Sequence, residues 1–115
     1  TLNGVQLLKA ETVDLMTRNH LDGDMADMDA ANFSGLDWSG IGFGLGFSVV
    51  LDPKRVGYGN KGIYGWSGAA STYFWVDPVA DLIAIFFTQF MPSRTYPIRS
   101  DLRPLVYRAL ALKSF

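Results

Sequence analysis

The sequence contains no cysteine and a single histidine, His20. Without cysteine, disulfide bonds and thiol chemistry are excluded, and the compartment stays open between cytoplasm and periplasm. One imidazole excludes a metal site that is built from several histidines of a single chain. We therefore expect no metal ion and no other cofactor.

Net charge is also small, because ten basic residues face eleven acidic ones and leave −1. A chain with so little net charge is not expected to bind nucleic acid. Long apolar runs are missing as well. The longest candidate, Leu82–Phe87, is far shorter than the roughly 20 residues that a membrane-spanning helix needs, so we expect a soluble protein with no membrane partner.

The chain starts at Thr1, with neither an initiator methionine nor a signal-peptide pattern. We expect it to be processed, or taken from a longer protein. Its 115 residues, 49% of them hydrophobic, suit one domain over residues 1–115. Acidic residues dominate up to Asp37 and basic residues from Met91 onward, which indicates two solvated faces or an acidic loop that meets a basic helix.

One helix is predicted from Ala10 to about His20, with an acidic first turn and a narrow apolar side typical of a surface helix. Residues 21–40 form a long loop whose methionine and aromatic residues indicate that it covers an apolar surface, such as the rim of a substrate pocket. The aspartates of this loop match only fragments of the calcium-loop pattern, so calcium binding is rejected.

A second helix is predicted from Ser100 or Asp101 to about Leu112. Either of the first two residues would cap it, and Pro104 would then lie in its first turn. Arg103 is expected on the side away from the core. The core-facing stripe follows the spacing i, i+3, i+4, i+7 and i+8, at Leu102, Leu105, Val106, Ala109 and Leu110.

Three antiparallel strands are predicted. Ile41–Leu51 alternates glycine with large apolar residues, which favours one strand whose glycine face sits against another backbone; no helix follows, so a dinucleotide-binding motif is rejected. Asp52–Arg55 is a turn. Ser71–Val76 and Leu82–Phe90 form a hairpin, and the second strand, apolar on both faces, should be central.

These elements predict an α+β fold: an antiparallel sheet of about three strands with a C-terminal helix packed on one face, and an N-terminal helix plus a long loop. Within it, the stretch Gly62–Pro78 passes through Trp66-Ser67-Gly68-Ala69 into an aromatic run. Small residues leave backbone N–H groups approachable, and such a strand end can form an oxyanion hole. The simpler alternative is that Trp66 only lines a core or pocket and Ser67 is an ordinary strand hydroxyl.

Taken in order, these elements resemble the C-terminal part of the serine β-lactamase-like superfamily, above all class C β-lactamases, penicillin-binding-protein-like enzymes and family VIII carboxylesterases. The resemblance implies that Trp66, Ser67 and Gly68 replace the family's Lys-Thr-Gly triplet as substrate-binding residues. It also implies that the Ala69 backbone N–H stabilises the oxyanion. Because Trp66 provides no ammonium group for a β-lactam carboxylate, a carboxylesterase is favoured over a β-lactamase.

No serine lies three residues before a lysine, so the family's Ser-x-x-Lys nucleophile motif is missing from this sequence. We expect an N-terminal segment of the same enzyme to supply the nucleophile for a small ester or amide substrate. This segment would be a separate chain, a cleaved partner or a lost part of the gene. The chain alone is expected to be inactive. The alternative is a catalytically inactive remnant that acts as a binding module or a homo-oligomer.

Overall fold

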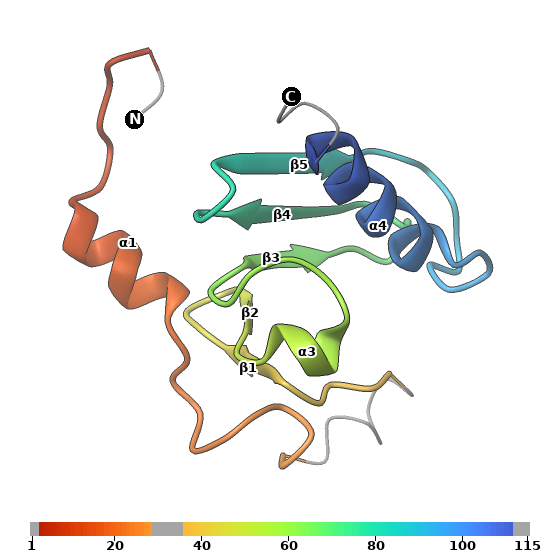
Figure 1. Ribbon diagram of the computed structural model, residues 1–115, viewed down its shortest axis with the longest axis horizontal. Coiled ribbons are helices and arrows are strands. Elements are labelled where there is room, and N and C mark those ends of the chain that lie inside the picture. The colour runs from red at the N-terminus through yellow and green to blue at the C-terminus, as the bar shows by residue number, and fades with distance from the viewer. Residues whose placement is uncertain (1–2, 29–35, 112–115) are drawn as a thin grey trace.

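The computed structural model describes residues 3–28 and 36–111, and its ribbon is drawn in Figure 1. No helix within these ranges is long and apolar enough to cross a membrane. The α+β class is confirmed. In chain order the elements are α1 (Ala10–Thr17), β1 (Ile41–Phe43), β2 (Ser48–Val50), α3 (Pro53–Val56), β3 (Tyr64–Ser67), β4 (Tyr73–Asp77), β5 (Leu82–Phe86) and α4 (Ile98–Ala111).

The sheet has five antiparallel strands in the order β1-β2-β3-β4-β5, two more than predicted. The prediction of one strand over Ile41–Leu51 is wrong, because residues 44–47 form a turn that folds this stretch into the β1–β2 hairpin. Gly44 N–H donates to the Phe47 carbonyl at 2.8 Å, and Gly46 has a φ of +99°, which favours glycine. Alternation of residue types cannot reveal a turn built from the same glycines.

The predicted close approach of another backbone is confirmed at Gly44, whereas Gly42 lies against a side chain. A Cβ added at Gly42 would lie 2.3 Å from Asn19 Oδ1, and one at Gly44 would lie 2.2 Å from the Met16 carbonyl oxygen. The Leu45 N–H donates to that same carbonyl at 2.9 Å. These contacts attach the C-terminal end of α1 to the β1–β2 hairpin. The helix itself has no buried residue and ends at Thr17, three residues before the predicted end.

The hairpin of β4 and β5 is confirmed, with Asp77 opposite Leu82 at its closed end. Asp77 is fully buried, and its carboxylate accepts hydrogen bonds from the Val79 and Ala80 N–H groups, Asn60 Nδ2 and Tyr107 Oη at 2.8–3.1 Å. Burial and the hydrogen bond to Asp77 raise the pKa of Tyr107. This carboxylate therefore links the hairpin turn, the loop before β3 and helix α4.

The prediction that the last strand is central is wrong for the described residues, since β5 stands at the edge of the sheet. Its side chains alternate between the α4 face and the opposite face, which we call the outer face; the outer face includes Phe74, Val76, Ile83 and Ile85. Ile83 and Ile85 are 67% and 60% exposed. β5 is therefore apolar on both faces although no described residue covers its outer face.

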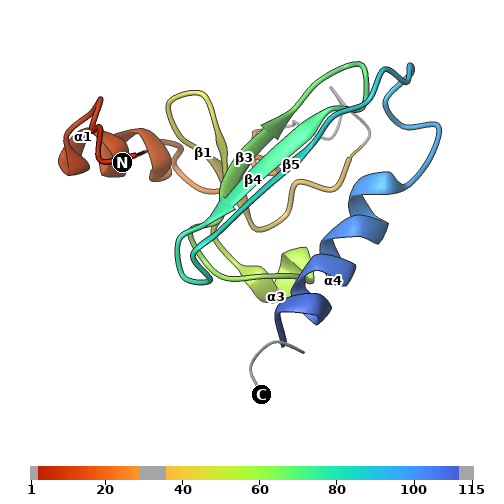
Figure 2. The ribbon, with the colours of Figure 1, turned by 90° about the horizontal axis from the view of Figure 1, so that it is seen from above.

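Helix α4 packs on one face of the sheet as predicted, and Figure 2 shows α3 on the same side. It begins at Ile98, so Ser100 and Asp101 are not its caps, and Pro104 lies inside the helix rather than in its first turn. The Ser100 hydroxyl donates to the Pro97 carbonyl at 2.8 Å. The predicted end at Leu112 lies outside the described residues.

The core-facing stripe of α4 is rotated relative to the prediction. Leu105 is 56% exposed and Ala109 is also exposed. Leu102 and Val106 pack against the core as predicted, and Ile98 and Tyr107 pack there as well. They surround a buried cluster of Val50, Ile63, Tyr73 and Trp75. The rotation turns Arg103 toward the sheet.

Residues 52–55 were predicted as a turn, but residues 53–55 form the first part of the short helix α3. Asp52 caps this helix, because its carboxylate accepts a hydrogen bond from the Lys54 N–H at 3.0 Å. Gly57 ends it with a φ of +84°, the left-handed conformation usual at a helix C-terminus. The chain then turns back toward β3, which places Tyr58 beside α4.

Candidate functional site

The second half of β3 has one unpaired edge within the described structure. Trp66 and Ser67 pair with Phe74 and Tyr73 of β4, whereas β2 reaches only as far as Gly65 on the other side. A Cβ added at Gly65 would lie 2.2 Å from the Phe74 carbonyl oxygen, so the close approach of β3 and β4 requires glycine there. The strand therefore ends with an open backbone edge, as the sequence predicts.

Ala69 lies in the turn after this edge, and β4 begins at Tyr73 rather than at the predicted Ser71. Gly68 N–H donates to the Thr72 carbonyl at 2.8 Å, which closes the turn. Ala69 is exposed, and no described residue accepts a hydrogen bond from its N–H. This N–H is thus available to a ligand, which is what an oxyanion contact needs.

Ser71 holds this turn in place. It is 4% exposed, has a φ of +65°, and donates from its hydroxyl to the Phe90 carbonyl at 2.6 Å. The Phe90 N–H donates in return to the Ala70 carbonyl at 3.1 Å. These two bonds attach the Ala69 turn to the segment that follows β5, so the position of the Ala69 N–H is fixed by the sheet.

Trp66 is 40% exposed and belongs to a small aromatic group beside the open edge. Its ring stacks on that of Trp38 at a centroid distance of 6.1 Å and meets the edge of Phe43 at 5.1 Å. Tyr73 and Trp75, by contrast, are buried core residues at 3% and 1% exposure. Trp66 therefore keeps the surface position that a residue in contact with substrate requires.

A pocket of about 440 Å³ adjoins the candidate residues on the α4 side of the sheet. Gly65, Trp66 and Ser67 form one wall, and α3 and α4 contribute the walls opposite. Residues 36–39 of the long loop also line it. The prediction that this loop borders a pocket is confirmed for these residues, while residues 29–35 lie outside the described structure.

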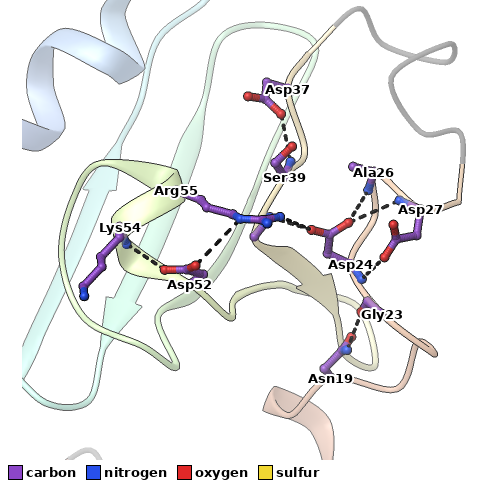
Figure 3. Close-up of polar contacts among 11 residues, drawn as sticks. Asn19, Gly23, Asp24, Ala26, Asp27, Asp37, Ser39, Asp52, Lys54 and Arg55 are labelled. Atoms are coloured by element: carbon purple, nitrogen blue, oxygen red, sulfur yellow. Dashed lines mark hydrogen bonds and ion pairs between the residues drawn. The ribbon is translucent and has the colours of Figure 1, made fainter.

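The described part of the loop is held by Asp24, as the close-up in Figure 3 shows. One carboxylate oxygen accepts from the Gly40 N–H at 2.7 Å and lies 3.9 Å from Arg55 Nη1, while the other accepts from the Ala26 and Asp27 N–H groups. The Gly40 hydrogen bond is the main cause that lowers the pKa of Asp24. These contacts fix the loop next to α3.

The sequence did not reveal the basic and aromatic wall of the pocket. Arg103 was expected to face away from the core, yet its guanidinium lies 4.4 Å from the ring centroid of Tyr58 and donates to the Tyr58 hydroxyl. Arg99, one turn earlier, also lines the pocket. Arg99 and Arg103 are one helical turn apart, which places them on the same side of α4. The sequence analysis did not use this spacing, because it assigned the core-facing side of the helix incorrectly.

His20 does not serve as a base for any serine among the described residues. Its Nε2 lies 2.7 Å from the Leu15 carbonyl oxygen, and the ring is exposed at the end of the α1 segment. The same residues contain no group of three or more histidine, aspartate or glutamate side chains that could hold a metal ion. What the site contains is a backbone donor, an aromatic wall and a pocket.

Comparison with known proteins agrees with this geometry. The family described as "Beta-lactamase" matches residues 2–108. Two curated proteins of Mycobacterium tuberculosis, "Uncharacterized protein MT1414" (strain CDC 1551 / Oshkosh) and "Protein Rv1367c" (strain ATCC 25618 / H37Rv), are each 38% identical over 98 residues. In both cases the match covers 81% of this chain and 24% of the relative. The chain thus spans about a quarter of the length of these relatives.

Solved structures of simvastatin synthase (LovD) from Aspergillus terreus are also similar. The unliganded enzyme superposes with a TM-score of 0.69 at 26% identity, and the LovD6 mutant with 0.71 at 25% identity. Each alignment covers 92% of this chain and 30% of the other. The similarity therefore extends over nearly the whole of this chain and a minor part of each enzyme.

Proposed function

Because the chain belongs to the beta-lactamase family, we propose that it supplies the oxyanion-binding strand and a pocket wall of a serine hydrolase that cleaves esters through an acyl-enzyme. The observation that carries the proposal is the Ala69 N–H, which is exposed at the end of β3 and has no acceptor among the described residues. A backbone donor aimed at a developing oxyanion is stabilising in the transition state, and its removal typically costs about 3 kcal/mol.

The preference for esters over β-lactams rests on Trp66. Its indole stacks on Trp38 at the position that the family resemblance gives to a lysine, so an apolar wall replaces a cation there. An apolar wall suits the acyl or alcohol part of an uncharged ester and offers no counter-charge to a carboxylate at that point. Ser67 continues the same strand edge and would bind the substrate through its backbone. The Gly68 N–H and carbonyl are bonded to Thr72 and Ser71 within the turn, so Gly68 would shape this edge rather than bind the substrate through its backbone.

The nucleophile and its base must come from outside this sequence, which lacks Ser-x-x-Lys. We propose that they belong to an N-terminal segment of the same enzyme. The experiment compares hydrolysis of a p-nitrophenyl ester by the pure 115-residue chain with hydrolysis after assembly with a segment that carries Ser-x-x-Lys. We expect a burst of p-nitrophenol and turnover only in the assembled protein, since acyl-enzyme formation needs the serine.

A second candidate is a non-catalytic module that associates with itself. The observation that favours it is the outer face of the sheet, where Ile83, Ile85 and Phe87 are 67%, 60% and 82% exposed. Contiguous exposed apolar side chains on an edge strand promote association between chains. The same surface equally suits contact with the N-terminal segment of the proposed enzyme. Ester turnover by the assembled protein would support the serine hydrolase, and self-association without turnover would support the non-catalytic module.

A further inference from the structure

The pocket beside β3 has a basic end made by two residues of α4. Arg99 and Arg103 both line it, and their Cζ atoms lie 5.8 and 5.9 Å from the ring centroid of Tyr73. Neither forms an ion pair with a described residue; the ion pairs found there join Arg55 to Asp24 and Asp52. Two guanidinium groups over one ring thus face the pocket without an acidic partner in the described structure.

Aromatic rings hold Arg103 at this end of the pocket. Its Cζ lies 4.4 Å from the ring centroid of Tyr58 and 5.7 Å from that of Trp75, and its Nη1 donates to the Tyr58 hydroxyl. No described carboxylate lies within ion-pair distance of this guanidinium or of Arg99. This wall of the pocket is therefore cationic and suits an anion.

The charge on these groups supports the same conclusion. Burial, with the neighbouring charges of Arg103 and Arg94, lowers the pKa of Arg99. The acid that lines the pocket, Asp37, already accepts a hydrogen bond from the Ser39 N–H at 2.9 Å, which is the main cause that lowers its own pKa. A bound anion would relieve the repulsion between Arg99 and Arg103, since opposite charge nearby favours the charged form of each.

We propose that this pocket binds the carboxylate of a small molecule with an apolar body. A guanidinium donates two parallel hydrogen bonds to a carboxylate, and Arg99 and Arg103 both line the pocket in which the carboxylate would lie. The rest of the lining is largely apolar, with Ile41, Val50, Val56 and Ile63 among its members, and about 440 Å³ suits a small molecule. The proposal does not depend on ester hydrolysis, because it concerns binding to this chain alone.

The test is a titration of the purified chain with 4-phenylbutyrate by calorimetry, beside the neutral 4-phenylbutyramide and inorganic phosphate. We expect 4-phenylbutyrate to bind at least tenfold more tightly than the other two, since charge-assisted hydrogen bonds and apolar contact are both needed. Equal affinity for the amide would overturn the role of the arginines, and equal affinity for phosphate would overturn the apolar body. Absence of binding by 4-phenylbutyrate would overturn the whole proposal.

Two variants locate the site. Arg99→Gln removes one cation of the pocket and Arg103→Gln removes the other; each should weaken 4-phenylbutyrate binding, Arg99→Gln by about tenfold. Arg108→Gln is the matched control, because Arg108 is exposed on the same helix and does not line the pocket. If Arg108→Gln weakens binding as much as Arg99→Gln, the effect is general electrostatics and the assigned site is wrong.

Discussion

At the scale of single residues, the proposed function depends on the Ala69 N–H. In the assembled enzyme, Ala69→Pro should lower kcat for a p-nitrophenyl ester by about a hundredfold or more, because proline has no N–H to donate to the oxyanion. Ala69→Gly is the matched control and should keep most of the activity, since it retains the donor. If the proline variant turned over the ester at the normal rate, Ala69 would have no part in the mechanism.

Asp24 gives a pH-dependent prediction at the same scale. Its pKa is lowered in the folded state, chiefly by the Gly40 hydrogen bond, so its contribution to stability is present above the unfolded value near pH 4 and is lost as the pH falls through the folded value. Asp24→Asn should therefore lower the urea midpoint at pH 7, and the difference from the parent chain should shrink toward pH 3. Asp22→Asn, an exposed neighbour, serves as control; a difference that persists unchanged at pH 3 would contradict the assignment.

The open strand edge beside Trp66 could be predicted from the sequence, whereas the surroundings of Arg103 could not. Trp66 and Ser67 lie at an open strand edge, as the small residues that precede the aromatic run indicate, and Gly68 follows in the turn. Arg103 was placed on the wrong side of its helix, because its aromatic partners come from segments distant in sequence and only the tertiary fold brings them together. The spacing of apolar residues along a helix cannot predict that an arginine packs over buried aromatic rings.

At the scale of elements, the β3–β4 contact gives a prediction about stability. Gly65→Ala should destabilise the chain by about 2 kcal/mol, because the new Cβ meets the Phe74 carbonyl of the neighbouring strand at 2.2 Å and the ladder must shift. Gly68→Ala is the matched control: its Cβ meets only the Thr72 hydroxyl, which can rotate away, so the loss should be much smaller. Equal losses in urea unfolding would show that the two strands are not in close contact at Gly65.

Where the pattern of apolar residues is strongly periodic, the sequence predicts correctly whether a segment is a helix or a strand. It does not predict the residues at which the element begins and ends. The β4–β5 hairpin follows from two apolar runs and a short connection, whereas the division of residues 41–51 into two strands depends on a glycine turn that alternation conceals. Helix α4 starts two or three residues earlier than predicted, because Pro97 precedes it and the Pro97 carbonyl accepts from the Asp101 N–H at 3.0 Å. Local hydrogen bonds of this kind set the boundaries.

At the scale of the whole molecule, the uncovered outer face leads to a prediction about association. The isolated chain should self-associate at micromolar concentration, and Ile85→Lys should shift it toward the monomer in light scattering, since a charge on the edge strand opposes pairing. Leu7→Lys is the control, because Leu7 is 90% exposed in the segment before α1, away from the sheet (Figure 1). A parent chain that is monomeric at this concentration would contradict self-association through the outer face.

The central claim is that this chain carries the oxyanion strand of an ester-cleaving serine hydrolase and lacks its nucleophile. The most direct measurement is the rate of p-nitrophenyl ester hydrolysis by the pure 115-residue chain and by the protein assembled with a Ser-x-x-Lys segment. We expect background hydrolysis for the chain alone, and a stoichiometric burst followed by turnover after assembly. Robust turnover by the chain alone, or none by a folded assembly, would contradict it.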